Sequence, residues 1–202
     1  DWYLMSAKEP ALPVKIGFLL WQGHLQAFFM GLLFFLAGYF AHASLAKRGP
    51  AGFLRERLVR LGLPTLFFML VIHPFVLLGL NPWQAEFPPV GAYYARSLST
   101  GRFLSSSGPM WFAFALLLFC ALLAAWRALR PGPGPAAVGT PTPGAGQLWR
   151  FGAGLVLVTF LVRTVQPVGT SVMNFQLCYF PQYIAAFVVG LAAARHGWLL
   201  PL

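Results

Sequence analysis

Acidic side chains are scarce in this sequence. Asp and Glu together number four, against fourteen Lys and Arg, which gives a formal net charge of +10. The four acids, Asp1, Glu9, Glu56 and Glu86, are far apart along the chain. No two carboxylates are therefore paired in sequence for general acid–base catalysis.

Cysteine is scarce as well, and common motifs of soluble enzymes are absent. Cys120 and Cys178 stand alone inside apolar runs, so we expect small core residues rather than a disulfide or a metal pair. The chain contains no GxxxxGK(S/T) phosphate loop, no HExxH zinc motif and no GxSxG nucleophile elbow. We therefore expect neither a metal site nor a tightly bound cofactor.

Charged residues of either sign are few. They make up 9% of the 202 residues, whereas a soluble domain carries about 25%. Hydrophobic residues make up 58%, and the mean hydropathy is +0.70, which is more apolar surface than a soluble fold of this size can hide. This composition predicts a polytopic protein in membrane lipid. The basic residues stand at the ends of apolar runs, so we expect no nucleic-acid partner.

Apolar runs and breakers predict an all-α polytopic membrane bundle of about five transmembrane helices. The expected spans are residues 24–44, 63–80, 110–128, 149–165 and 175–194. Residues 16–23 are expected to form an interfacial turn, because 16–46 exceeds one span of ~20 residues. Residues 1–202 form a single membrane domain, within which the Pro/Gly-rich segment 131–146 predicts a flexible cytoplasmic linker. The polar and aromatic segment 81–109 predicts an outer loop.

A basic segment separates the first two spans. Residues 47–60 contain five cations and one acid, namely Lys47, Arg48, Arg55, Arg57, Arg60 and Glu56. The positive-inside rule places this segment as a cytoplasmic loop of a multi-pass protein in the cell's inner (plasma) membrane. Gly49-Pro50 breaks the helix there, and a short amphipathic helix follows.

In the second span, His73-Pro74 predicts a kink, with His73 expected to satisfy a carbonyl that the proline frees. The five-span topology puts the N-terminus outside. Together with the absence of an initial Met, this predicts an upstream segment before Asp1.

Four sequence blocks occur in an order that resembles the membrane acyltransferase 3 family. They are FFMGLLFFLAGYF (28–40), KRGPAGFLRERLVRLGLP (47–64), GPMWFAFALLLF (108–119) and FPQYIAAFVVGLAAARHGWL (180–199). The resemblance implies an integral membrane enzyme of about ten helices, of which this chain is a fragment lacking the first and the later helices. Such enzymes transfer an acyl group, commonly acetyl from acetyl-CoA, to a hydroxyl of an extracytoplasmic carbohydrate or similar acceptor.

The resemblance also implies roles for particular residues. Arg57 and Arg60 match the family's Arg-x-x-Arg, which implies binding of acyl-CoA; the residues alone leave binding of lipid headgroups open. The family's catalytic His is expected upstream of Asp1. Within the chain, His24 is the candidate base, and an interfacial His is the alternative. Many relatives have a carboxylate where this sequence has Phe114.

Polar residues of the last two spans are candidates for a substrate tunnel. Arg163 lies in an apolar span and either faces a cavity or extends to the interface. Gln176, Tyr179, Gln182 and Tyr183 share one face of the expected fifth helix. They either line a tunnel or join helices through hydrogen bonds.

An acyltransferase is the function that these features favour. A hydroxyl acceptor can attack a thioester directly with one general base, so the missing nucleophile motif is no objection. The alternatives are a non-catalytic membrane subunit and a transporter fragment. A transporter predicts inverted repeats, which the sequence does not show.

Overall fold

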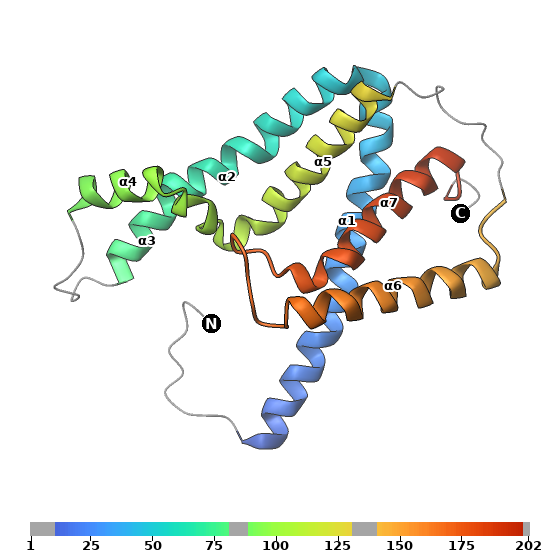
Figure 1. Ribbon diagram of the computed structural model, residues 1–202, viewed down its shortest axis with the longest axis horizontal. Coiled ribbons are helices and arrows are strands. Elements are labelled where there is room, and N and C mark those ends of the chain that lie inside the picture. The colour runs from blue at the N-terminus through green and yellow to red at the C-terminus, as the bar shows by residue number, and fades with distance from the viewer. Residues whose placement is uncertain (1–10, 81–88, 131–140, 200–202) are drawn as a thin grey trace.

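The computed structural model describes residues 11–80, 89–130 and 141–199, with the side chains of residues 26, 27 and 78–80 excepted. Over these residues the chain is helical and contains no strand (Figure 1). The all-α prediction is therefore confirmed. Residues 81–88 of the predicted outer loop and 131–140 of the predicted linker lie outside the described part.

The first two predicted spans form one bent helical hairpin. α1 (Leu12–Arg57) runs to a bend at Gly49 (φ 69°, ψ 171°), a backbone conformation that favours glycine, and Pro50 follows. Beyond the bend the helix continues through α2 (Leu63–Phe67) and α3 (His73–Leu80), so that the two arms meet at the bend in Figure 1.

One sequence prediction about this hairpin is wrong. Residues 16–23 are helical rather than an interfacial turn, because the isolated glycines there do not end a helix. The predicted break at Gly49-Pro50 is confirmed, and the helix predicted after it is present but continues through Leu58–Gly62 into the second arm.

Two π-helical turns in the second arm each lie just before a proline. Leu58–Gly62 precedes Leu63-Pro64, and Phe68–Ile72 precedes His73-Pro74. Proline cannot donate to the carbonyl four residues earlier, and a wider turn accommodates that loss.

At the second proline the freed carbonyl is that of Leu70. It accepts a hydrogen bond of 2.6 Å from Tyr94 Oη, which lies on α4 (Val90–Ser99). The tyrosine therefore fulfils the role that the sequence had assigned to His73. It also joins α4, a helix within the predicted outer loop, to the hairpin.

Four helical stretches of the described chain are long and apolar enough to cross a membrane. They are Leu12–Leu77, Gly108–Leu129, Ala145–Val165 and Leu177–His196. The first has 66 residues and contains both arms of the hairpin, so all five predicted spans are present with shifted bounds. The later ones include α5 (Trp111–Leu129), α6 (Ala145–Val165) and α7 (Phe180–His196). The chain is a multi-pass membrane protein.

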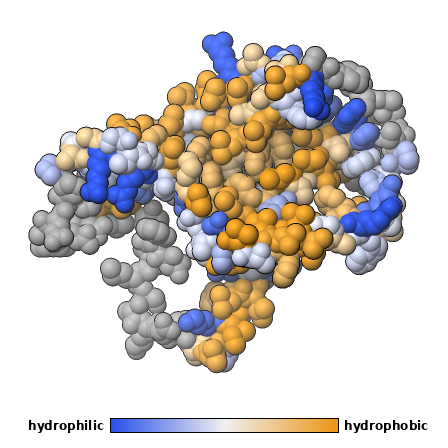
Figure 2. Space-filling view, viewed as in Figure 1, coloured by the Kyte–Doolittle hydropathy of each residue, from blue (hydrophilic) through white to orange (hydrophobic). Residues whose placement is uncertain are grey.

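The core lies where α1, α5 and α7 meet. Phe34 is fully buried there, with its ring centroid 4.8 Å from that of Tyr183 and 5.2 Å from that of Phe119. On the outside, apolar side chains cover most of the face seen in Figure 2, with hydrophilic residues at its edges. No described residue of α6 is fully buried. Such a surface suits acyl chains rather than water.

Two glycines allow α1 and α7 to cross closely. A Cβ at Gly38 would lie 2.1 Å from the carbonyl oxygen of Phe187, and one at Gly190 would lie 2.1 Å from that of Phe35. Backbone therefore meets backbone at this crossing, as small residues permit in membranes. Gly31, about two helical turns before Gly38 on α1, has nothing within 4 Å of its Cβ position.

Candidate functional site

A basic cluster at the bend of the hairpin is organised by Glu56, the one acidic side chain in the described part of the chain. Its carboxylate pairs with Arg48, contacts Nη2 of Arg60 at 3.0 Å and accepts a 3.4 Å hydrogen bond from Ser44 Oγ. Ser44 and Arg48 precede Gly49, whereas Glu56 follows it. The ion pairs therefore hold the two sides of the bend together. The side chain of Glu56 is only 13% exposed, and that of Arg60 is 68% exposed.

Arg57 is the last residue of α1. Its guanidinium is 5.2 Å from the ring centroid of Phe53, which is fully buried. Its Nε is buried and has no hydrogen-bond partner, and its charge acts on buried Cys120 of α5. Since Glu56 is engaged by Arg48 and Arg60, the half-buried cation of Arg57 has no carboxylate partner among the described residues.

Further cations approach His42 of α1 from two other helices. The charges of Arg127, near the end of α5, and Arg195, near the end of α7, both act on its imidazole. The sequence had explained these residues as charges that set topology. The signal that identifies them is a basic residue in the last turn of each span.

A small pocket lies at the other ends of α5 and α7. It has a volume of about 80 Å³ and is lined by Trp111, Gln176, Tyr179 and Tyr183. The guanidinium of Arg163, near the end of α6, lies 5.5 Å from the ring centroid of Tyr179. We call this the aromatic pocket. Its walls offer aromatic faces, an amide and a nearby cation.

Asn174 joins the two chain segments that build the aromatic pocket. Its Nδ2 donates to Ser107 Oγ at 2.9 Å and to the carbonyl oxygen of Gly108 at 3.1 Å. Its φ is 65°, a conformation that asparagine tolerates better than most residues. The turn before α7 is thereby fixed to the turn before Trp111. Sequence analysis missed this residue, although Asn in a short polar turn is a general signal for it.

The structure brings together four of the five predicted tunnel residues. Gln176, Tyr179 and Tyr183 line the aromatic pocket, and Arg163 lies beside Tyr179. Gln182 is half-buried on α7 and does not line this pocket. The prediction that Gln176 and Tyr179 lie on the fifth helix is wrong. α7 begins at Phe180, and a short 3-10 turn, Leu177–Tyr179, precedes it.

The other predicted site residues lie elsewhere. His24 is exposed on the part of α1 that extends beyond the bundle, where residues 11–25 are all exposed. The ring centroid of Phe114, where the resemblance implied a carboxylate, lies 5.2 Å from that of Phe175. Arg57 and Arg60 share the basic cluster but face different partners.

Packed aromatic rings lie inward of the aromatic pocket. Tyr183 lines that pocket and is 1% exposed, and its ring stacks on Phe34 of α1. Phe119 contacts Phe34 and Phe187 with tilted rings, at centroid separations of 5.2 and 5.6 Å. The core therefore connects the two polar ends mechanically through packed side chains.

Comparison with known proteins gives one match. A family model of the acyltransferase 3 class, described as an acyltransferase domain, matches residues 4–202. No curated protein and no solved structure matches the chain. The family match covers the hairpin, the basic cluster and the aromatic pocket.

Proposed function

Because the chain belongs to the acyltransferase 3 family, we propose that it transfers an acyl group from acyl-CoA to a hydroxyl of an extracytoplasmic carbohydrate or similar acceptor. Acetyl is the acyl group that we propose. Family membership and the apolar helices support a membrane acyltransferase. The donor, the acceptor and their binding sites are our proposal.

The observation that carries the proposal is the state of Arg57. It is a half-buried cation without a carboxylate partner in the described part, placed next to further cations at one end of the bundle. A buried cation of this kind favours an anionic ligand. Coenzyme A has phosphate groups, and guanidinium forks match phosphate oxygens in geometry and charge. We assign Arg57 and Arg60 to these phosphates and the basic cluster to the cytoplasmic side.

The reaction requires little covalent chemistry from the protein. The acceptor oxygen bonds to the thioester carbonyl carbon, the carbon–sulfur bond breaks, and coenzyme A leaves as the thiol after taking up a proton. One general base removes the proton of the acceptor hydroxyl. Within this sequence we assign this base to His24, which is exposed on α1. The protein's main contribution is to position donor and acceptor.

The aromatic pocket is the proposed acceptor side. Trp111 and Tyr179 offer ring faces of the kind that pack against sugar rings, and Gln176 offers an amide for hydroxyl groups. Arg163 lies beside them. The pocket is at the opposite end of α5 and α7 from the basic cluster, which agrees with transfer across the bilayer.

Transfer of labelled acetyl from acetyl-CoA in membranes tests the proposal. Replacing Arg57 and Arg60 by Ala should lower transfer by about 100-fold, because two charge-assisted hydrogen bonds are lost. Arg55→Ala is the matched control, since Arg55 lies in the same segment and is exposed. Unchanged transfer in the double variant would exclude the assigned donor site. Activity absent from the parent chain would favour a non-catalytic subunit.

A further inference from the structure

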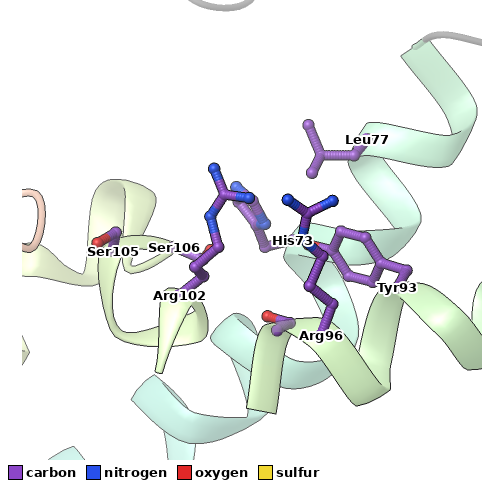
Figure 3. A pocket seen from close by; sticks show the side chains of 8 residues that line it. His73, Leu77, Tyr93, Arg96, Arg102, Ser105 and Ser106 are labelled. Carbon is purple, nitrogen blue, oxygen red and sulfur yellow. The ribbon is translucent and has the colours of Figure 1, made fainter. Parts of the chain in front are cut away.

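A second, larger pocket lies at the end of the second hairpin arm. It has a volume of about 540 Å³ and is bounded by α3, α4 and the turn Arg102–Ser105. Figure 3 shows the side chains of His73, Arg96 and Arg102 directed toward one another inside it. Neither the proposed donor site nor the aromatic pocket includes these residues. We call it the arginine pocket.

Its charge is positive and is not balanced by any acid in the described part of the chain, where the one carboxylate is Glu56 at the bend of the hairpin. Two guanidinium groups that converge in one pocket repel each other unless an anion lies between them. Nδ1 of His73 is buried and has no hydrogen-bond partner. The pocket therefore offers two charged donors and one unused polar atom at the same place.

The usual explanation for membrane-flanking arginines does not apply here. Arg96 and Arg102 lie in the segment opposite the strongly basic bend, whereas the positive-inside rule concentrates Lys and Arg on the side of that bend. A cation on the other side needs a local reason. Burial raises the pKa of Tyr93, which also lines the pocket, with Tyr94 adding to the rise and Arg102 opposing it. The phenol is therefore neutral at physiological pH.

The walls of the arginine pocket are fixed by contacts of their own. The hydrogen bond from Tyr94 to the carbonyl of Leu70 joins α4 to the helix that carries His73. Gly101, with a φ of 67°, turns the chain from α4 into the segment of Arg102. The same segment continues through Ser107, which Asn174 holds against the aromatic pocket. The two pockets are thus connected by a short and anchored stretch of backbone.

We propose that the arginine pocket binds an oxyanion, a phosphate or a carboxylate, that is carried by the acceptor. The assignment to the acceptor rests on the proposed function: residues 105–111 lead from the wall of the arginine pocket to Trp111 of the aromatic pocket. Arg96 and Arg102 hold the anion, and His73 adds a hydrogen bond. The acceptor class is then an acidic or phosphorylated saccharide rather than a neutral one.

Equilibrium binding tests the site without any need for catalysis. The probe is inorganic phosphate, titrated against the purified chain in a non-ionic detergent. Replacing Arg96 and Arg102 by Gln should weaken binding at least about tenfold. Parent and variant both carry Arg57→Gln and Arg60→Gln, so that the proposed coenzyme A site does not bind the probe. On this background Arg55→Gln, at an exposed site, should leave the phosphate affinity unchanged. Equal affinity in the parent and the Arg96/Arg102 variant would overturn the proposal.

Competition identifies the source of the anion. Glucuronate should displace phosphate from the arginine pocket, whereas glucose at the same concentration should not. The same titration in nanodiscs of phosphatidylglycerol or phosphatidylcholine tests a lipid headgroup as the occupant. Loss of phosphate binding in the anionic nanodiscs alone, with no effect of glucuronate, would overturn the assignment to the acceptor. Failure of acetyl transfer with phosphate binding intact would refute the proposed function and leave the anion site standing.

Discussion

The crossing of α1 and α7 at Gly38 and Gly190 should be the most sensitive packing position in the described chain. A Cβ at Gly38 would lie 2.1 Å from a backbone oxygen of Phe187, and separations under 3.0 Å are essentially never seen for real Cβ atoms. The atoms that a Cβ would meet at Gly38 and Gly190, the carbonyl oxygens of Phe187 and Phe35, belong to the backbone and cannot rotate away as a side chain could. To admit one methyl group, the helices must therefore separate by about 1 Å or rotate.

The cost follows from overpacking. Gly38→Ala should lower the free energy of unfolding by about 1–3 kcal/mol, and Gly190→Ala should do the same. In an exposed helix the same change stabilises by about 0.5–1 kcal/mol, because glycine is the poorer helix former. Gly31→Ala is therefore the matched control, since nothing lies within 4 Å of its Cβ position.

Thermal unfolding in detergent, followed by tryptophan fluorescence, measures the difference. Each kcal/mol should change Tm by about 2–4 °C in a chain of this size. We expect Gly38→Ala and Gly190→Ala to unfold below the parent and Gly31→Ala at or above it. Equal or higher Tm for both crossing variants would refute the close approach of the two backbones. It would also remove the basis for the packed connection between the polar ends.

Three further variants test individual contacts. Glu56→Gln should destabilise the bend by about 1–3 kcal/mol, because it leaves Arg48 and Arg60 unneutralised; a Tm equal to the parent's would mean that the ion pairs contribute nothing. Tyr94→Phe should cost about 1 kcal/mol, since the carbonyl of Leu70 loses its donor, and hydrogen exchange in the second arm should rise; unchanged exchange would indicate another donor. Asn174→Ala should cost about 1–2 kcal/mol and lower labelled acetyl transfer in membranes by displacing the aromatic pocket; transfer at the parent's rate would separate that pocket from the reaction.

Much of the fold was predictable because lipid imposes a simple rule on the backbone. A segment in the bilayer must satisfy its own hydrogen bonds, so an apolar run near the required length becomes a helix. The spans at 110–128 and 175–194 were found with ends shifted by one or two residues. The turn expected at 16–23 was wrong, because apolar length alone does not show where a helix bends.

The candidate site was predictable only in part, because contacts between distant segments depend on packing. The family resemblance drew attention to Arg57, the position in an apolar span to Arg163, and a shared helix face to Tyr179. They did not show that Glu56 engages Arg60 instead of Arg57, or that Asn174 reaches across to Ser107. Ser107 and Asn174 are 67 residues apart in sequence. Glu56 has several arginines nearby in sequence, and the sequence does not show which of them it pairs with.

The sequence alone determined that this chain is helical, lies in a membrane and resembles an acyltransferase, because composition, the placement of cations and four ordered blocks are local properties. Only the tertiary structure decided which arginine is left without a carboxylate among the described residues and which two guanidinium groups converge beside His73. Local patterns fix how each segment folds against lipid and water. The pairing of charges depends on distances between segments, and these are set by how closely the helices pack.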